Sequence, residues 1–312
     1  MPAYSLPENA VWFITGCSSG IGLALATHLL TKPSIRVVAT ARDPSTLSAL
    51  PPSPRLLTIP LDVTSPASIE SALSSAIEAF SRIDVLVNNA GYAITADTET
   101  APPPAARGIL ETNFWGAAHL SQRILPIFRD QNPESGQRGG LVLQITSLGG
   151  RHGFPGNAFY HASKFALEGF SESVAKEMHP EWNVHFCCVE PGGVKTRWAE
   201  TALGGGVGLE SGDRHPAYRD PDMPINQMLR YKKNPEAMKH WADTGLVVRG
   251  LWEVVSGGHV PFRLPLGADS WGMQKRGHEL ELERLDRVKG VAVGVSGDGA
   301  EEQLKSIEFL EL

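Results

Sequence analysis

The sequence predicts a doubly wound α/β fold, in which a parallel sheet of about seven strands is covered by helices on both faces. Two observations support this prediction. Short runs that are apolar throughout alternate along the chain with longer segments of helical periodicity. Strands that are apolar on both faces are typical of a parallel sheet buried between helices. In such folds a ligand binds beyond the carboxyl ends of the strands.

The first half of the chain alternates regularly. The runs "AVWFIT" (10–15), "IRVVATA" (35–41) and "RLLTIPLDV" (55–63) predict the first three strands. One helix is expected at 20–30, directly after the first strand. A second is expected at 65–80, because Ser65 can cap it and Pro66 fits its first position, where proline loses no hydrogen bond.

The second half continues the pattern. The runs "IDVLVNN" (83–89), "GLVLQITS" (140–147) and "VHFCCVEP" (184–191) predict the next three strands, and "HVPFRLPL" (259–266) predicts a seventh. Helical patterns predict a long helical region at 103–129 and a helix at 157–179.

One domain is expected to span residues 1–288. Residues 199–225 are rich in Gly, Asp and Pro between two patterned regions, and so long a loop is typically a lid, a binding loop or a disordered segment. We therefore expect residues 199–245 to form a substrate loop or lid. The glycine-rich sequence past Lys289 predicts a flexible C-terminal tail at 289–312.

Composition excludes several classes of function. The 312 residues carry a net charge of −6 and no basic cluster, so nucleic acid is not an expected partner. No apolar run is long enough to predict a membrane span. The histidines lack metal-ligand spacing, and no metal site is expected. The three cysteines, Cys17, Cys187 and Cys188, form no disulfide framework or Cys-x-x-Cys pair, which predicts a reducing compartment and a cytoplasmic location.

A glycine-rich turn follows the first predicted strand. In "TGCSSGIG", Gly16, Gly20 and Gly22 let the chain turn tightly and let backbone N–H groups approach a pyrophosphate, and the next helix contributes its N-terminal dipole. The spacing differs from G-x-G-x-x-G, so an ordinary strand–turn–helix connection is the alternative. The position after the first strand favours dinucleotide binding.

The residues after the second and third strands bear on the choice of cofactor. Arg42 suits the 2′-phosphate of NADP(H), with an exposed, solvated arginine as the alternative. Asp43 keeps NAD(H) possible, although it precedes Pro44 and can instead cap the next turn. Asp62 can accept from an adenine amino group or serve a turn or helix cap. We expect NADP(H) to be preferred over NAD(H).

Taken together, the motifs resemble those of the short-chain dehydrogenase/reductase family. The resemblance rests on "TGCSSGIG", Asp62, "NNAG" (88–91), Asn113, Ser147, "YHASK" (160–164) and "PGGVKT" (191–196). It covers roughly residues 10–200, with a looser fit to about 288, and implies a single-domain Rossmann-type fold. The glycine spacing is similar to that of the core-type subgroup. The motif wording is closest to 17β-hydroxysteroid and retinol dehydrogenases and to fungal carbonyl reductases.

A tyrosine and a lysine four residues apart carry the predicted chemistry. On a helix this spacing places Tyr160 and Lys164 on one face. A nearby ammonium is expected to lower the pKa of the tyrosine, which is ordinarily near 10. The resemblance implies that Tyr160 is the general acid in ketone reduction, that Ser147 binds the substrate oxygen, and that Asn113 interrupts its helix and holds a water linked to the lysine. The alternatives are a strand-end turn cap for the serine and a locally bonded amide for the asparagine.

The resemblance also implies a cofactor site and a substrate site. The expected cofactor-binding residues are Gly16, Ser18, Ser19, Gly20, Ile21, Gly22, Arg42, Asp62, Val63, Asn89, Ala90, Gly91, Tyr160, Lys164, Pro191, Gly192, Val194 and Thr196. The expected substrate residues are His152, Phe154, Phe159 and Trp198, and packing within the lid is their alternative role.

These residues predict an NADPH-dependent reductase of a ketone or aldehyde on a bulky hydrophobic substrate such as a polyketide, a steroid or a retinoid. The reverse reaction would oxidise a secondary alcohol. One alternative is an epimerase, dehydratase or cyclase of the same fold with bound NADP(H), and another is a non-catalytic NADP(H)-binding regulator. The family resemblance implies a homodimer or homotetramer.

Overall fold

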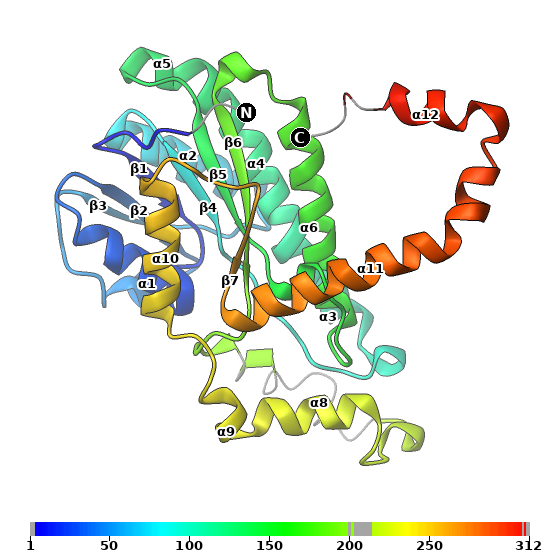
Figure 1. The fold of residues 1–312 in the computed structure, drawn as a ribbon. Helices are drawn as coiled ribbons and strands as arrows, with labels where there is room; N and C mark the ends of the chain where they lie inside the picture. Colours follow the sequence, from blue (N-terminus) through cyan, green and yellow to red (C-terminus); the bar gives the residue numbers. More distant parts are fainter. Residues whose placement is uncertain (1–3, 199–200, 203–213, 308, 310–312) are drawn as a thin grey trace.

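A seven-stranded parallel sheet forms the centre of the protein in the computed structural model, which describes residues 4–198, 201–202, 214–307 and 309 (Figure 1). The strands are β1 (Val11–Ile14), β2 (Arg36–Ala41), β3 (Leu56–Pro60), β4 (Val85–Asn88), β5 (Gly140–Ile145), β6 (Val184–Pro191) and β7 (Arg263–Leu266). Their order is β3-β2-β1-β4-β5-β6-β7, and every neighbouring pair is parallel. The predicted fold class is confirmed. The order reverses between β1 and β4, where a ligand-binding crevice is expected.

Side chains of each strand enter two separate hydrophobic cores. In β1, Trp12 and Ile14 belong to the core on one face of the sheet, and Val11 and Phe13 belong to the core on the other. All four side chains are fully buried. Because both faces are covered, the strand is an uninterrupted apolar run and does not alternate with polar residues.

Helices cover both faces of the sheet (Figure 1). The core on one face includes residues of α1 (Gly20–Leu30) and α10 (Thr244–Ser256), and the core on the other includes residues of α2 (Pro66–Phe80), α4 (Ala117–Pro126) and α6 (Ala158–Glu177). Helix α2 begins as predicted, because the Ser65 side chain accepts a hydrogen bond from the Ser68 amide and Pro66 occupies the first position.

The helical region predicted at 103–129 is divided into several helices. Helix α3 (Pro103–Leu110) is joined to α4 by a π-helical turn at Glu111–Gly116. A second π-helical turn (Ile127–Gln131) leads into the short α5 (Asn132–Ser135). Asn113 lies inside the first turn, so the expectation that this residue interrupts its helix is confirmed. Such π turns are frequent at functional sites.

Between residues 214 and 243, the segment expected as a substrate loop or lid contains two α-helices. These are α8 (Pro224–Lys233) and α9 (Pro235–Met238), which lie below the main body in Figure 1. Arg214 ties the segment to the body, because its guanidinium donates hydrogen bonds of 2.6 and 2.8 Å to the buried carboxylate of Asp97. Residues 199–200 and 203–213 of the expected lid lie outside the described residues.

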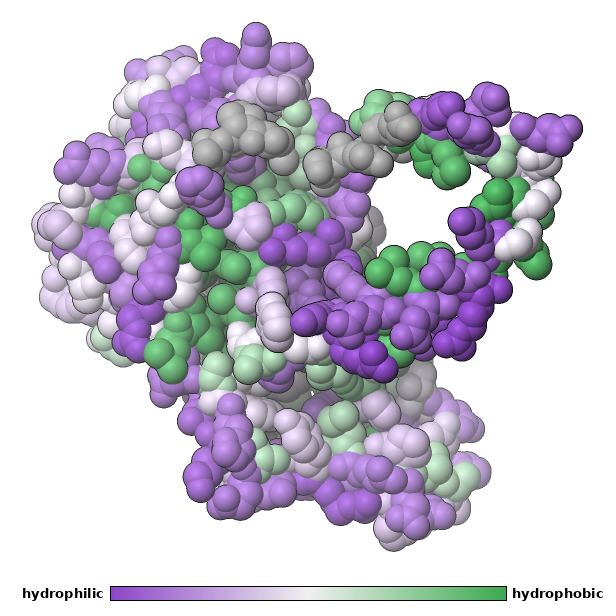
Figure 2. Space-filling view, viewed as in Figure 1, coloured by the Kyte–Doolittle hydropathy of each residue, from purple (hydrophilic) through white to green (hydrophobic). Residues whose placement is uncertain are grey.

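The C-terminal segment is helical where the structure describes it. The expected domain end at residue 288 falls within α11 (Ala268–Gly294), and α12 (Ala300–Ser306) follows. The Glu-, Leu- and Arg-rich sequence before residue 288 favours a helix, which here continues through the glycine-rich residues 289–294 that we expected to be part of a tail. The two helices form an arc beside the body, and apolar residues lie on its inner side (Figures 1 and 2).

Candidate active site

The glycine-rich turn between β1 and α1 packs closely against the protein's own backbone, and side chains at Gly16 and Gly22 would clash with it. Gly16 and Gly20 have φ values of +69° and +58°, a backbone region that side chains disfavour. A Cβ added at Gly16 would lie 2.9 Å from the Ala90 Cα, and one at Gly22 would lie 2.5 Å from the Gly16 carbonyl oxygen. Ser19, at the N-cap of α1, makes no side-chain capping bond. The turn therefore fits a pyrophosphate held by backbone N–H groups at a helix N-terminus.

The segment after β4 holds this turn in place. The Asn89 side chain donates to the carbonyl oxygens of Thr15 (2.8 Å) and Gly16 (3.1 Å). The Thr15 hydroxyl accepts from the amides of Asn89 and Ala90, both at 2.9 Å. The sequence reasoning missed Thr15, although it stands directly before Gly16 in "TGCSSGIG". The two strand ends thus form one rigid unit around the crevice.

The segment after β6 lies against the same turn. The Gly192 amide donates to the Leu266 carbonyl at 2.9 Å, and the buried Val194 pairs with Ala242. The methyl group of Thr196 would lie 3.5 Å from a Cβ placed on Gly20. Pro191, the last residue of β6, is buried. The structure therefore brings the predicted "PGGVKT" residues to the glycine-rich turn.

The acids and the arginine near the ends of β2 and β3 have different surroundings. The Asp43 side chain accepts from the Ser45 amide at 2.9 Å and caps a 3₁₀ turn (Pro44–Leu47), which is the capping role left open above. Asp62 accepts from the Thr64 amide (2.9 Å) and hydroxyl (2.7 Å), which is the turn role left open above. Arg42 is exposed. The pKa of Asp62 is lowered mainly by the hydrogen bonds from Thr64. The charge of Arg42 lowers it to a smaller extent.

Three of the remaining predicted cofactor residues lie around these segments. Ser18 and Ile21 are half-buried in the glycine-rich turn and the first turn of α1. The Ser18 carbonyl is 3.5 Å from the Arg197 guanidinium. Val63 is buried and packs on the π-helical turn, because a Cβ on Gly116 would lie 2.8 Å from its Cγ2 atom.

Helix α6 carries the tyrosine and the lysine into the interior. Tyr160 is 8% exposed and Lys164 is 5% exposed. Burial raises the pKa of Tyr160 to about 12, against the opposing effect of a hydrogen bond with the Ser147 side chain. Burial lowers the pKa of Lys164 to about 8, against the opposing charge of Glu168.

The expected lowering of the tyrosine pKa by the lysine is not what this structure shows. The Lys164 ammonium lies 6.0 Å from the centroid of the Tyr160 ring and donates to the Ile145 carbonyl at 2.7 Å. At this separation burial of the phenol has the larger effect, because removing it from water disfavours the charged form. Tyr160 therefore remains protonated at neutral pH in the protein alone.

Asn113 lies beside Lys164 but is held by backbone groups. Its side-chain oxygen accepts from the Tyr92 amide at 3.0 Å, and its amide donates to the Tyr92 carbonyl at 2.9 Å and the Ser163 hydroxyl at 3.1 Å. A Cβ on Gly91 would lie 3.0 Å from the Asn113 oxygen and 3.6 Å from the Lys164 ammonium. Gly91 thus lets the loop after β4 pass close to both side chains.

Ser147 stands just beyond β5 and next to Tyr160. Its hydroxyl accepts from the Gly149 amide at 2.9 Å, so the turn-capping role left open above is present. That bond uses the oxygen as an acceptor and leaves the hydroxyl proton free to be donated. The same side chain also interacts with the Tyr160 hydroxyl, so the two hydroxyl groups lie together.

The four predicted substrate residues do not all lie at Tyr160. The Trp198 ring is 5.5 Å from the Tyr160 ring, centroid to centroid. Phe154 packs edge-on against His161 at 5.4 Å. Phe159 is half-buried in the first turn of α6. His152 packs against α11, where a Cβ on Gly277 would lie 2.5 Å from its ring. Trp198 therefore contacts the ring of Tyr160, whereas His152 packs against α11.

The sequence reasoning also missed Lys232 of α8. Its side chain is buried, its ammonium donates to the Asn157 side-chain oxygen, and it lies 5.7 Å from the centroid of the Trp198 ring. Nothing in the sequence distinguishes it from the exposed Lys233 that follows.

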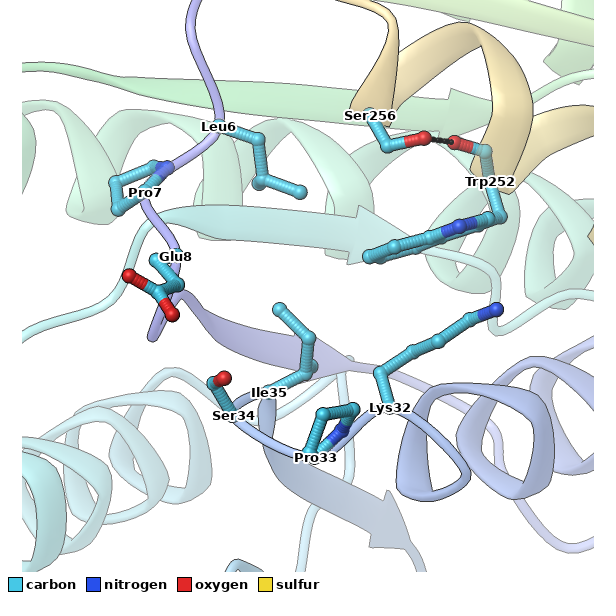
Figure 3. A pocket seen from close by; sticks show the side chains of 9 residues that line it. All are labelled: Leu6, Pro7, Glu8, Lys32, Pro33, Ser34, Ile35, Trp252 and Ser256. Atoms are coloured by element: carbon cyan, nitrogen blue, oxygen red, sulfur yellow. Dashed lines mark hydrogen bonds between the residues drawn. The ribbon is translucent and has the colours of Figure 1, made fainter.

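A separate cavity of about 260 Å³ lies at the amino-terminal side of β2, away from these residues (Figure 3). It is lined by residues 6–8, 32–35, Trp252 and Ser256. The Lys32 ammonium lies 4.9 Å from the Trp252 ring centroid. Because the candidate catalytic residues follow the carboxyl ends of the strands, this cavity is not part of their site.

Helical membrane spans and metal sites are both absent from the part of the chain that the structure describes. No helix there is long and apolar enough to cross a membrane. No group of three or more His, Cys, Asp or Glu side chains there has the arrangement of a metal site.

Comparison with known proteins extends these observations. A family model for short chain dehydrogenases matches residues 10–203. Oxidoreductase calM from Penicillium decumbens is 41% identical over 290 residues, which are 91% of this chain and 92% of that protein. Human retinol dehydrogenase 8 is 35% identical over 265 residues, 80% of this chain and 79% of that protein. The crystal structure of a short-chain dehydrogenase from Streptomyces avermitilis has a TM-score of 0.77 and 28% identity, and covers 92% of this chain and 99% of that one.

Proposed function

The chain belongs to the short-chain dehydrogenase family and is an oxidoreductase related to retinol dehydrogenases, and we propose that it uses NADPH to reduce a ketone or aldehyde on a bulky hydrophobic substrate. A polyketide, a steroid or a retinoid has this chemistry. The observation that carries the proposal is the grouping of Ser147, Tyr160 and Lys164 beyond the carboxyl end of β5, beside a glycine-rich turn that fits a pyrophosphate.

Tyr160 donates the proton in this proposal. A phenol whose pKa is raised to about 12 remains protonated at neutral pH. It can therefore donate a proton to an oxygen that gains negative charge during reduction. Ser147 donates a second hydrogen bond to that oxygen from the adjacent hydroxyl and stabilises the developing charge. Lys164 holds a positive charge beside them at pH values below about 8.

The residues that would hold the cofactor surround the crevice between β1 and β4. The glycine-rich turn and the N-terminus of α1 would bind the pyrophosphate. Lys164 would bind the nicotinamide ribose, and the segment at 191–196 would lie beside the nicotinamide. Bound NADPH supplies a hydride, and the protein supplies orientation and the proton.

Arg42 supports a preference for NADPH over NADH. It is exposed beyond the end of β2, where the ribose 2′-position of a dinucleotide is read in this fold. The carboxylate of Asp43 is bonded to the Ser45 amide, which makes it less available to a ribose hydroxyl. A guanidinium at this position pairs with a 2′-phosphate.

The substrate side of Tyr160 is apolar. Trp198 and the alanines Ala93 and Ala202 form one small cluster with the tyrosine. Aromatic and aliphatic contacts of this kind suit a large apolar molecule with a single reactive carbonyl. We therefore expect higher kcat/KM for bulky ketones than for short ones.

A homodimer or homotetramer is also part of the proposal. Helix α11 exposes Leu282 (64%), Leu285 (55%), Val288 (52%) and Val291 (77%). Contiguous exposed apolar side chains of this kind are typical of protein interaction surfaces. Light scattering on the full chain tests the assembly, and a monomer at micromolar concentration would contradict this part.

A screen of steroid, retinoid and polyketide ketones with NADPH tests the function. The loss of NADPH absorbance is measured together with the amount of alcohol formed. One NADPH consumed per alcohol supports reduction. Conversion of substrate without net NADPH consumption would instead indicate an epimerase, dehydratase or cyclase, and no conversion of any compound would contradict the proposal.

A further inference from the structure

Lys232 is a buried lysine on the lid helix α8. Its side chain is 8% exposed. Its ammonium donates to the side-chain oxygen of Asn157, the N-cap residue of α6, and lies 5.7 Å from the centroid of the Trp198 ring. The charge is therefore held between the lid and the start of the helix that carries Tyr160.

One aromatic side chain separates this ammonium from the candidate proton donor. The Trp198 ring, beneath the ammonium, packs on the Tyr160 ring at a centroid distance of 5.5 Å. The charge of Lys232 also contributes to lowering the pKa of His161, although burial is the main cause. Lys232 thus acts at the end of α6 where the substrate is expected.

The charge of Lys232 is not balanced by the protein residues described around it. Within residues 4–198, 201–202 and 214–307, no carboxylate forms an ion pair with Lys232. Its protein partner is a neutral amide, and burial alone lowers its pKa to about 8. An ammonium taken out of water without a counter-charge is costly, and a partner carboxylate offsets that cost.

A purely structural role would not require a charge. Asn157 already connects α6 to the loop after β4, because its amide donates to the Ile94 carbonyl (2.8 Å) and the Thr95 hydroxyl (3.3 Å). A neutral donor at residue 232 would complete this connection to the lid equally well. An ammonium has three donors, and the bond to Asn157 uses one of them.

We propose that Lys232 binds a carboxylate on the substrate and that the enzyme therefore selects hydrophobic keto acids over neutral ketones of the same shape. This inference rests on the proposed reductase function. The carboxylate pairs with the ammonium on the lid side of Trp198, while the ketone reaches Tyr160 on the other side of that ring. Lys232 is then a specificity-determining residue.

The test compares acids with their methyl esters. The probes are benzoyl propanoate, benzoyl butanoate and benzoyl pentanoate, which differ in the separation of ketone and carboxylate, and the methyl ester of each. The full-length wild type, K232Q, K232R and the exposed-lysine control K233Q are assayed with NADPH. Fluorescence of bound NADPH confirms that each variant is folded.

We expect the wild type and K233Q to prefer at least one acid over its ester by about tenfold or more in kcat/KM, because a hydrogen bond to a charged group discriminates at this level. K232Q can still bond to Asn157 but has no charge, so it should lose the preference. K232R should keep most of it.

Calorimetry measures the affinity of the wild type for the same acids and esters. This test of the inference depends neither on turnover nor on the folding of any variant. Equal affinity for every acid and its ester would overturn the inference, and so would an acid preference that K232Q retains. If the esters are reduced but the acids have no advantage, the proposed reductase stands and the carboxylate site does not. If acids bind selectively but no compound is reduced, the proposed function fails and the carboxylate site stands.

Discussion

The ammonium of Lys164 donates a 2.7 Å hydrogen bond to the carbonyl oxygen of Ile145, the last residue of β5. This bond joins α6 to the end of the central sheet and fixes the charge near Tyr160 and Ser147. It also explains why the lysine is buried, since a carbonyl oxygen replaces part of its hydration. The tyrosine then keeps its proton, because its own burial outweighs the effect of its hydrogen bond with Ser147.

The two directions of the reaction should depend on pH in opposite ways. Reduction requires the protonated form of Tyr160, which predominates at all pH values below about 12, and the charged form of Lys164, whose pKa is about 8. We therefore expect kcat/KM for reduction to be flat from pH 6 to about 8 and to fall above it. Alcohol oxidation requires the phenolate, so its kcat/KM should rise with pH over the same range. Initial rates in both directions measure this, and reduction that accelerates above pH 8 would contradict these assignments.

Arg42→Asp should change the cofactor preference. An aspartate repels a 2′-phosphate and accepts hydrogen bonds from a 2′-hydroxyl. We expect the NADPH-to-NADH ratio of kcat/KM to fall by at least about tenfold, because a charge-assisted hydrogen bond is lost. Asp43→Asn is the matched control, because it removes the neighbouring charge while asparagine can still cap the turn, and it should leave the ratio unaltered. An unchanged ratio in Arg42→Asp would show that the arginine does not contact the cofactor.

Asp97→Asn should detach the lid from the body. The substitution removes the negative charge that pairs with Arg214. In the wild type, the Arg214 guanidinium makes two short hydrogen bonds to the fully buried carboxylate of Asp97. We expect the free energy of unfolding of this segment to fall by roughly 2 kcal/mol. Limited proteolysis within residues 214–233 should become faster, and KM for the substrate should rise. The exposed Asp220→Asn is the control, and equal proteolysis rates of the two variants would contradict the anchoring role.

Glu190→Gln should make stability less sensitive to pH. Burial, and secondly the charge of Glu168, raises the pKa of Glu190 to about 7, from an ordinary value of 4.5. Between these two values the unfolded chain releases a proton that the folded protein holds, so the wild type loses stability as pH rises. The glutamine has no such dependence and can still bond to Gln274.

As pH rises from 4.5 to 7, the Tm of Glu190→Gln should increase relative to that of the wild type by about 2 °C or more. Glu172→Gln is the control. Hydrogen bonds from Arg263 and Lys176 lower the pKa of Glu172, so its contribution to stability is constant above pH 4.5. A Tm difference for Glu190→Gln that does not change with pH would show that this carboxyl titrates normally.

Much of the fold could be predicted because buried parallel strands have a simple sequence pattern. The apolar runs located all seven strands, and β6 was predicted with the bounds it has in the structure. The third strand ends at Pro60 and not at residue 63, because Asp62 starts a turn with Thr64. The π-helical turn at Glu111–Gly116 contains Asn113, whose hydrogen bonds to Tyr92 join segments that are distant in the sequence.

The site could be predicted where it consists of short motifs, and not where it depends on tertiary packing. The glycine-rich turn, Ser147, Tyr160 and Lys164 are each recognisable by position along the chain. The helices of the lid were missed because that segment is polar and rich in proline. The raised pKa of Tyr160 and the burial of Lys232 come from surroundings that are contributed by several elements.

The most direct test of the account is the turnover of Tyr160→Phe, with Tyr231→Phe on the exposed face of α8 as the control. Removing the hydroxyl eliminates the proton donor and leaves the ring packing on Trp198 in place. We predict that kcat for ketone reduction falls by at least about 10²-fold, while NADPH binds with an affinity close to that of the wild type and Tyr231→Phe remains active. Turnover of Tyr160→Phe at the wild-type rate would contradict the central claim that this tyrosine protonates the substrate.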